Sequence, residues 1–214
     1  MNRVMMVLAG LIAAGCVAML ARAEETKKEE PVLKQCVLAG GCYWCVEAVF
    51  EELEGVKEAV SGFAGSGAHK ARDAAEAHER GYAEAVRITY DPAVIDYVAL
   101  LEVFFATHDP TSLNRQGADV GVEYRSAVFW KDAPEKEAAE GMIRALEESD
   151  AYGGKSIVTT IEELKDFVEA RPGHQNYVCN NRGQPYVEHV AMEKVKKVRE
   201  KFKERLKAES PLQR

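Results

Sequence analysis

Apolar residues recur along the chain with two different spacings, and each spacing predicts one kind of element. Residues 32–39 form a short apolar run that ends at two glycines, as expected of a buried strand. Apolar positions then recur at helical spacing from Cys42 and stop at Gly55, which predicts a helix. Residues 57–64 and 83–90 are predicted strands, and the second alternates apolar and polar residues.

The pattern continues with a second helix and a fourth strand. Asp91-Pro92 is a turn signal before a helix predicted over 95–107, and 124–130 is typical of a strand. The order strand, helix, strand, strand, helix, strand is that of ferredoxin-like folds. We therefore predict an α+β protein with a ferredoxin-like two-layer α/β sandwich core, whose helices cover one face of an antiparallel or mixed sheet.

The remaining segments predict additional helices and an irregular C-terminal region. Residues 65–80 are a polar insertion compatible with a helix, and 193–207 alternate Lys or Arg with Glu around an apolar stripe, which is typical of a solvated amphipathic helix. The other expectations are a helix at 134–149, a strand or extended segment at 156–161, a short helix at 162–168 and an irregular, turn-rich stretch at 171–187.

The first 23 residues have the pattern of a secretory signal peptide. They combine one Arg with an apolar run and end in the small-x-small site Ala21-Arg22-Ala23. The run is shorter than the roughly 20 apolar residues of a membrane span. We expect an exported protein, periplasmic or secreted, in which 24–214 form a single domain. A lipoprotein acylated at Cys16 and an uncleaved membrane anchor stay open as alternatives.

Charge and cysteine content narrow the function. Acidic residues outnumber basic ones by 35 to 28, so nucleic acid is not expected as a partner. Four cysteines follow the first 23 residues, too few for a disulfide framework: Cys36, Cys42, Cys45 and Cys179. Cys36 is interpreted as a core residue of its strand. No second CxxC or paired His follows, so neither a metal site nor another cofactor is expected.

Cys42 has the surroundings of a reactive thiolate. It follows two glycines and lies in the first turn of a predicted helix, where unpaired N–H groups favour a negative charge. Cys45 lies one helical turn later on the same face, so the two could form a disulfide. Tyr43 and Trp44 are either core aromatics or walls of an apolar pocket. A thioredoxin-like oxidoreductase also places CxxC at a helix start, but after a longer lead-in.

Three blocks resemble signatures of the peptide methionine sulfoxide reductase A family. They are GGCYWCVE at 40–47, GYAEAVRITYDP at 81–92 and HDPTSLNRQGADVGVEYRSAVF at 108–129, with HQNY at 174–177 similar to a fourth. The similarity covers about 32–190. It implies an oxidoreductase with a ferredoxin-like core and no metal, which uses thiols to reduce methionine S-sulfoxide, free or in proteins, and so repairs oxidised proteins.

The resemblance also implies roles for individual residues. The nucleophile is Cys42, the pocket aromatics are Tyr43 and Trp44, the catalytic acid is Glu84, and the long block contributes Asp119 and Tyr124. The chemistry suits these residue types, because a sulfoxide oxygen leaves only when it is protonated. To donate a proton near neutral pH, the carboxyl needs a pKa raised by burial. Methionine leaves, and the nucleophile becomes a sulfenic acid.

A second thiol is needed to resolve the sulfenic acid as a disulfide. Cys45 is the first choice because it is one turn away, and Cys179 is the alternative, since the family often places resolving cysteines in this region. The implied partners are oxidised-methionine peptides and proteins and a thioredoxin-like reductant outside the cytoplasm. A monomer is expected.

The sequence departs from the family pattern in one loop. The usual Tyr-containing stretch is replaced by GSGAHKARDAAEAHER at 65–80, Tyr82 stands in place of His, and Glu123 in place of Gln. Tyr82 and Glu84 should share a strand face, so we predict that Tyr82 supplies the hydrogen bond that the missing Tyr would make. A partly exposed aromatic at a strand edge is the alternative. The replaced loop also leaves open a binding protein that recognises oxidised methionine without turnover.

Overall fold

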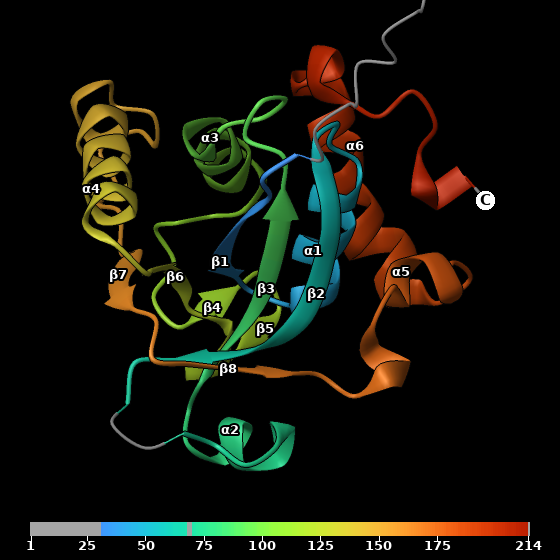
Figure 1. The fold of residues 1–214 in the computed structure, drawn as a ribbon, viewed down its shortest axis with the longest axis horizontal. Helices are drawn as coiled ribbons and strands as arrows, with labels where there is room; N and C mark the ends of the chain where they lie inside the picture. Colours follow the sequence, from blue (N-terminus) through green and yellow to red (C-terminus); the bar gives the residue numbers. More distant parts are fainter. Residues whose placement is uncertain (1–30, 68–69, 214) are drawn as a thin grey trace, which may run out of the picture. The chain divides into compact units, whose positions relative to one another are not determined.

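A computed structural model describes residues 31–67 and 70–213, and its centre is a six-stranded sheet (Figure 1). The strand order is β7-β6-β1-β3-β2-β8. The strands span β1 (Lys34–Gly40), β2 (Val56–Gly65), β3 (Ala83–Tyr90), β6 (Ser126–Trp130), β7 (Thr160–Glu163) and β8 (Asp166–Glu169). A separate hairpin pairs β4 (Arg115–Gln116) with β5 (Asp119–Val120). The signal peptide predicted at 1–23 lies outside the described residues.

The four inner strands confirm the predicted fold class. Their order is β6-β1-β3-β2 with antiparallel pairing, and α1 (Tyr43–Glu51) and α3 (Tyr97–Thr107) connect them in the predicted βαββαβ sequence. β7 extends this sheet in parallel beside β6, and β8 extends it antiparallel beside β2. The two extra strands therefore lie at the two edges of a ferredoxin-like sheet.

The two faces of the sheet are covered differently. On one face α1, α3 and α6 (Met192–Lys201) enclose the main core, which contains fully buried Leu38, Phe50 and Phe104. The opposite face carries a small cluster, mostly alanine, that packs against Leu164 and Phe167 near the start of β8. Side chains alternate between the faces along a strand. Cys36 and Leu38 accordingly join the main core, whereas Val37 and Ala39 join the small cluster.

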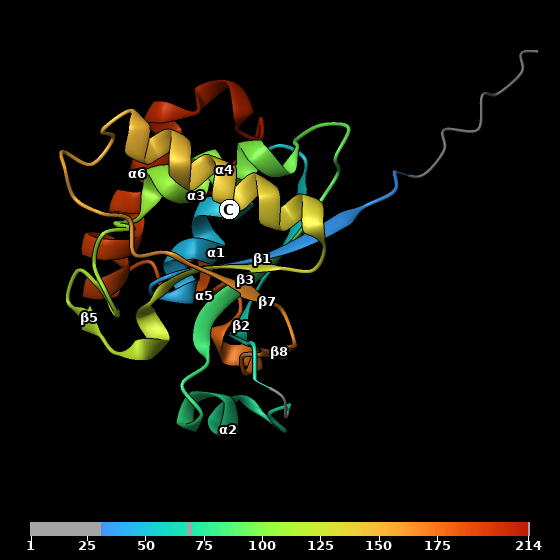
Figure 2. The same cartoon turned by 90° about the vertical axis from the view of Figure 1, so that its left-hand side faces the viewer.

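Two other helices lie further from the centre. α4 (Ala133–Glu148) packs near α3, and α2 (Ala74–Glu79) lies beyond one end of the sheet, next to β2 and β8, in both views (Figures 1 and 2). α2 begins at Asp73, whose side chain accepts hydrogen bonds from the backbone N–H groups of Ala75 and Glu76. Within 31–67 and 70–213, no helix is long and apolar enough to cross a membrane.

The structure corrects the prediction for 162–168. This segment is not a helix but the end of β7 and the start of β8, where Phe167 and Val168 pair with Ala64 and Phe63 of β2. The pairing partner lies about a hundred residues earlier, and strand formation depends on such partners more than on local preference. The irregular stretch at 171–187 contains the short helix α5 (Tyr177–Asn180), and a π-helical turn at Val187–Ala191 follows it.

Candidate active site

Cys42 lies at the point where β1 passes into α1. It is the N-cap residue of the helix, and its carbonyl accepts the backbone N–H groups of Cys45 and Val46. Gly41 before it has φ +89°, and a Cβ there would come within 2.5 Å of the Gln116 side chain. Glycine is therefore needed at this turn. The side chains of Cys42 and Cys45 are 6% and 0% exposed, so both thiols are buried at the helix start.

An interaction between the thiols of Cys42 and Cys45 governs their ionisation. It lowers the pKa of Cys45 to about 7. The same interaction, together with burial, raises the pKa of Cys42 well above its ordinary value. Two coupled groups lose their first proton easily and their second with difficulty. The pair can therefore hold one thiolate near neutral pH.

Glu84 on β3 contacts the same helix start. Its Oε2 accepts a hydrogen bond from the backbone N–H of Tyr43 at 3.1 Å. Burial, and after it the proximity of Cys42, raises the pKa of this carboxyl to about 8. Glu84 is therefore mostly protonated at neutral pH, and it can act as a proton donor next to the nucleophile.

Aromatic side chains from α1 and the C-terminal region enclose the site. The Tyr43 hydroxyl is hydrogen-bonded to Nδ1 of His174 at 2.7 Å. Trp44 stacks on Tyr177, with ring centroids 3.7 Å apart and planes inclined by 8°, and Tyr186 approaches Trp44 edge-on at 6.2 Å. These rings form an apolar wall with polar groups at its edges.

Asp119 and Tyr124 complete the polar side of the site. Asp119 belongs to the β4–β5 hairpin, and its Oδ2 accepts a hydrogen bond of 2.7 Å from the hydroxyl of Tyr186. The same hydroxyl lies 3.8 Å from Sγ of Cys45. Burial, followed by the nearby carboxyl of Glu84, raises the pKa of Tyr124 to about 12, so its phenol stays protonated and can donate a hydrogen bond.

Comparison with known proteins agrees with this combination of groups. A family model described as peptide methionine sulfoxide reductase matches residues 34–206. The chain belongs to the peptide methionine sulfoxide reductase family. It is thus an oxidoreductase that uses thiols to reduce methionine sulfoxide and repair proteins, as the sequence predicted.

Relatives and solved structures cover most of the chain. Peptide methionine sulfoxide reductase MsrA of Deinococcus radiodurans is 46% identical over 175 residues, covering 81% of this chain and 84% of the relative. The MsrA of Chromobacterium violaceum is 43% identical over 79% of this chain and 97% of its own. Mxr1 from Saccharomyces cerevisiae in reduced form matches with a TM-score of 0.62 at 27% identity, covering 71% of this chain and 87% of its own. Methionine sulfoxide reductase A of Corynebacterium diphtheriae gives 0.61 at 28%, with 72% and 77% covered.

Cys179 and Cys36 lie apart from the thiol pair of this reductase. Cys179 is half-buried on α5, and its sulfur donates to the carbonyl oxygen of Pro211 at 3.6 Å. Cys36 is fully buried in the main core, where desolvation raises its pKa, in line with the predicted structural role. In the described part of the chain, no three His, Cys, Asp or Glu side chains are grouped so that they could hold a metal ion.

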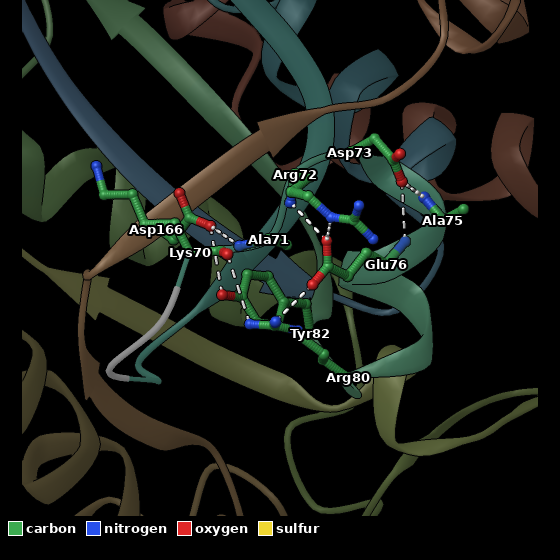
Figure 3. Close-up of polar contacts among 9 residues, drawn as sticks. All are labelled: Lys70, Ala71, Arg72, Asp73, Ala75, Glu76, Arg80, Tyr82 and Asp166. Atoms are coloured by element: carbon green, nitrogen blue, oxygen red, sulfur yellow. Dashed lines mark hydrogen bonds and ion pairs between the residues drawn. The ribbon is translucent and has the colours of Figure 1, made fainter.

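The structure gives Tyr82 a different role from the predicted one. Its side chain packs in the main core as Tyr43 does, but its hydroxyl donates to Oδ2 of Asp166 at 3.3 Å (Figure 3). Asp166 is only 9% exposed and needs hydrogen-bond donors. This hydrogen bond holds the edge strand β8, and the hydrogen bond from Tyr82 to the sulfoxide stays a prediction. Because β8 was predicted as a helix, this partner was not visible in the sequence.

Tyr177 and Tyr186 were missed by reasoning from the sequence. Tyr177 belongs to the HQNY segment, which was noted for its resemblance but given no role. Tyr186 stands in the turn-rich stretch with no periodic pattern around it, so no local signal connects it to Asp119 or to Cys45. Its place in the site depends on how the C-terminal region folds back over α1.

Proposed function

We propose that Cys42 attacks the sulfur of methionine S-sulfoxide while Glu84 protonates the sulfoxide oxygen. The observation that carries this proposal is the position of Glu84. Its carboxyl is bound to the first backbone N–H after Cys42, and its pKa of about 8 keeps it protonated. A soft thiolate and a neutral acid at one helix start are the two groups that sulfoxide reduction needs.

The reaction transfers the oxygen to the enzyme. The thiolate of the pair is on Cys42 when the shared proton resides on Cys45, and this sulfur forms a bond to the sulfoxide group as Glu84 gives its proton to the oxygen. The new bond between the two sulfurs and the S–O bond of the substrate then break as the hydroxyl moves to Sγ of Cys42, so methionine leaves and Cys42 becomes a sulfenic acid. The methionine sulfur gains two electrons and the cysteine sulfur loses them.

The surrounding groups orient the substrate. Tyr124 keeps its proton and can donate a hydrogen bond to the sulfoxide oxygen. Tyr43 and Trp44 offer apolar ring surface to the methyl group and side chain of the substrate. Asp119 accepts the hydroxyl hydrogen of Tyr186 and so holds this phenol beside the thiols, 3.8 Å from Sγ of Cys45.

We propose Cys45 as the resolving cysteine, because it lies one helical turn after Cys42 and the two thiols shift each other's pKa. Its thiol attacks the sulfenic acid, water leaves, and a Cys42–Cys45 disulfide forms. Cys179 faces Pro211 and would have to be carried to the site with α5. A thioredoxin-like dithiol then accepts the disulfide by exchange and returns both cysteines to thiols.

Turnover of each sulfoxide epimer tests the proposal. Purified protein with dithiothreitol should convert methionine S-sulfoxide to methionine and leave the R epimer unchanged, as followed by mass spectrometry. The Cys42→Ser variant should be inactive, since a serine hydroxyl is neither ionised at neutral pH nor soft. Turnover by this variant above about a tenth of wild type would reject Cys42 as the nucleophile.

We further propose that the protein is exported and acts as a monomer. The signal-peptide pattern at 1–23 supports export, and the reductant would then have to act outside the cytoplasm. Cell fractionation, N-terminal sequencing of the mature protein and light scattering test these points. A mature protein that begins at Met1 in the cytoplasm would contradict export.

A further inference from the structure

Residues 70–80, the described part of the replaced loop that follows the strand end, are held by a set of polar contacts (Figure 3). The first part of this segment is tied to β8, because Oδ2 of Asp166 accepts hydrogen bonds from the backbone N–H of Ala71 at 2.8 Å and from the hydroxyl of Tyr82. The Tyr82 ring packs closely on β2, where a Cβ at Gly65 would lie 2.6 Å from it. These contacts hold both ends of the segment against the sheet.

Ion pairs and a cap fix α2 itself. Glu76 binds the guanidinium groups of Arg72 and Arg80 at 2.7 and 2.5 Å, and Asp73 caps the first turn (Figure 3). Exposed pairs of this kind add little stability singly. Together with the buried Asp166 contacts, however, they leave the short helix one position relative to β2 and β8. Its inner face is therefore shaped before any ligand binds.

That inner face borders a cavity of about 600 Å³. Ligand pockets in proteins have volumes of roughly 300–1,000 Å³, so the cavity is large enough to hold a side chain and part of its backbone. Its walls are aromatic rings and methyl groups, namely Tyr43, Phe63, Ala74, Ala75 and Ala170. An uncharged, apolar group would bury surface against these walls and brings no polar group of its own that would lose hydrogen bonds.

The cavity is continuous with the proposed catalytic site. Tyr43 and Glu84 line it, and both also belong to the group of residues around Cys42. Trp44 instead stacks on Tyr177, on the side of the C-terminal region. A group in the cavity would thus lie beside the sulfoxide that Glu84 protonates. In a peptide substrate, the residue next to the oxidised methionine would occupy this position.

The rim of the cavity indicates which side chain fits. Arg171 and Glu79 carry opposite charges there, so the rim favours neither a cation nor an anion. The ring of His78 is nearly parallel to that of Phe63, with planes inclined by 18° and centroids 6.3 Å apart. Flat rings on one wall suit a flat apolar guest.

We propose that this cavity binds the side chain of a residue next to the oxidised methionine in a peptide, and that it favours an uncharged aromatic side chain. The proposal rests on the reductase function proposed above and adds a peptide subsite to it. The subsite is built from α2, the part of the chain in which the sequence departs from the family pattern. It makes the replaced loop a determinant of peptide preference.

Short capped peptides test the subsite. One set carries Phe, Ala or Asp before methionine S-sulfoxide and a second set carries them after it, with free methionine S-sulfoxide measured in parallel. Wild-type protein should show a kcat/KM for Phe at least about tenfold above that for Ala in one of the sets, the scale of a modest apolar pocket. Turnover of free sulfoxide without any preference for Phe would overturn the subsite and leave the reductase function intact. Absence of turnover of the free sulfoxide would overturn the function itself.

Filling the cavity should remove the preference. Ala75→Leu places a larger side chain on its wall and should bring the Phe-to-Ala ratio close to one, whereas Ala145→Leu on the exposed face of α4 should keep the wild-type ratio. A ratio that persists in Ala75→Leu would contradict the proposal. An equal loss on free sulfoxide and on the Phe peptide would also contradict it, because the sulfoxide itself would then occupy the cavity.

Variants of His78 give a second, independent test on an exposed side chain. His78→Ala removes one ring from the wall and should lower the Phe-to-Ala ratio severalfold, and His78→Phe should restore it. If all three proteins had the same ratio, the stacked wall would have no role in binding and the aromatic preference would be wrong.

Discussion

The carboxyl of Glu84 is neutral because of where β3 places it. Burial beside Cys42 raises its pKa to about 8, so the acid holds a proton at the pH at which a thiolate can already form on the cysteine pair. Below the pKa of the pair the nucleophile is missing, and above about 8 the acid is missing. Activity should therefore pass through a maximum between these two ionisations.

Replacing Glu84 by Gln keeps the shape of the side chain and removes the proton. We expect kcat to fall by about 10²- to 10⁴-fold, the usual range for general acid catalysis. The alkaline fall of kcat/KM expected for wild type above pH 8 should be absent in this variant. A pH–rate profile of both proteins checks this, and an unchanged kcat would mean that another group supplies the proton.

The resolving step is separable from the chemical step by counting product without reductant. Cys45→Ser should still release about one methionine per enzyme molecule, because Cys42 alone performs the transfer, and it should then stop as a sulfenic acid that dimedone traps. Wild type should instead contain a Cys42–Cys45 disulfide after the same treatment. Peptide mapping that finds Cys42 joined to Cys179 would reject Cys45 as the resolving residue.

At the scale of elements, the sequence predicted those parts of the fold that depend on local pattern. The inner strands and α1 and α3 are marked by apolar periodicity and by glycines or Asp-Pro at their ends, and they form as predicted. β8 was predicted as part of a helix, and β7 only overlaps the strand or extended segment predicted at 156–161, because both are edge strands defined by their partners β2 and β6.

The residues of the candidate site also differ in whether the local sequence predicts them. Cys42, Glu84, Asp119 and Tyr124 stand in motifs, and the structure brings them together around the start of α1. Tyr186 reaches the site only through the folding of the C-terminal region. The Tyr82 hydroxyl donates a hydrogen bond to Asp166 on β8, a strand that the sequence did not predict. Long-range contacts of this kind have no signature in a single sequence.

The contact between Tyr82 and Asp166 predicts an effect on stability rather than on chemistry. Tyr82→Phe removes one hydrogen bond from a buried carboxylate and should lower the free energy of unfolding by about 1 kcal/mol. Urea denaturation measures this change, and kcat/KM on free methionine sulfoxide should stay near the wild-type value. A loss of kcat/KM at unchanged stability would restore the substrate contact that the sequence predicted.

For the molecule as a whole, some buried ionisable groups lower the stability of the fold as pH falls, and others lower it as pH rises. His108 is fully buried between Phe104 and Ser126, and burial lowers its pKa to about 3. The unfolded state binds the proton from about pH 6.5 downward, so the folded state loses stability as pH falls below that value. Buried carboxyls with a raised pKa have the opposite effect, because they lower the stability of the fold as pH rises.

Glu47 is the clearest of these carboxyls. It is 1% exposed, and burial, with Glu51 next to it, raises its pKa to about 7. Between about pH 4.5 and 7 the folded protein holds a proton that the unfolded chain has released, so this group makes the fold less stable as pH rises through that range. Glu51 behaves in the same way, also with a pKa of about 7.

Glu47→Gln should therefore stabilise the protein at alkaline pH. Glutamine keeps the size of the side chain and has no proton to lose. The free energy of unfolding of the variant should therefore rise relative to that of wild type between pH 4.5 and 7, and the difference should stay constant above pH 7. The measurement is the difference in free energy of unfolding between the two proteins at several pH values from 4.5 to 8.5, with reductant present. Taking the difference removes the contribution of His108, which both proteins share. A difference that is independent of pH would show that Glu47 is not held neutral in the fold.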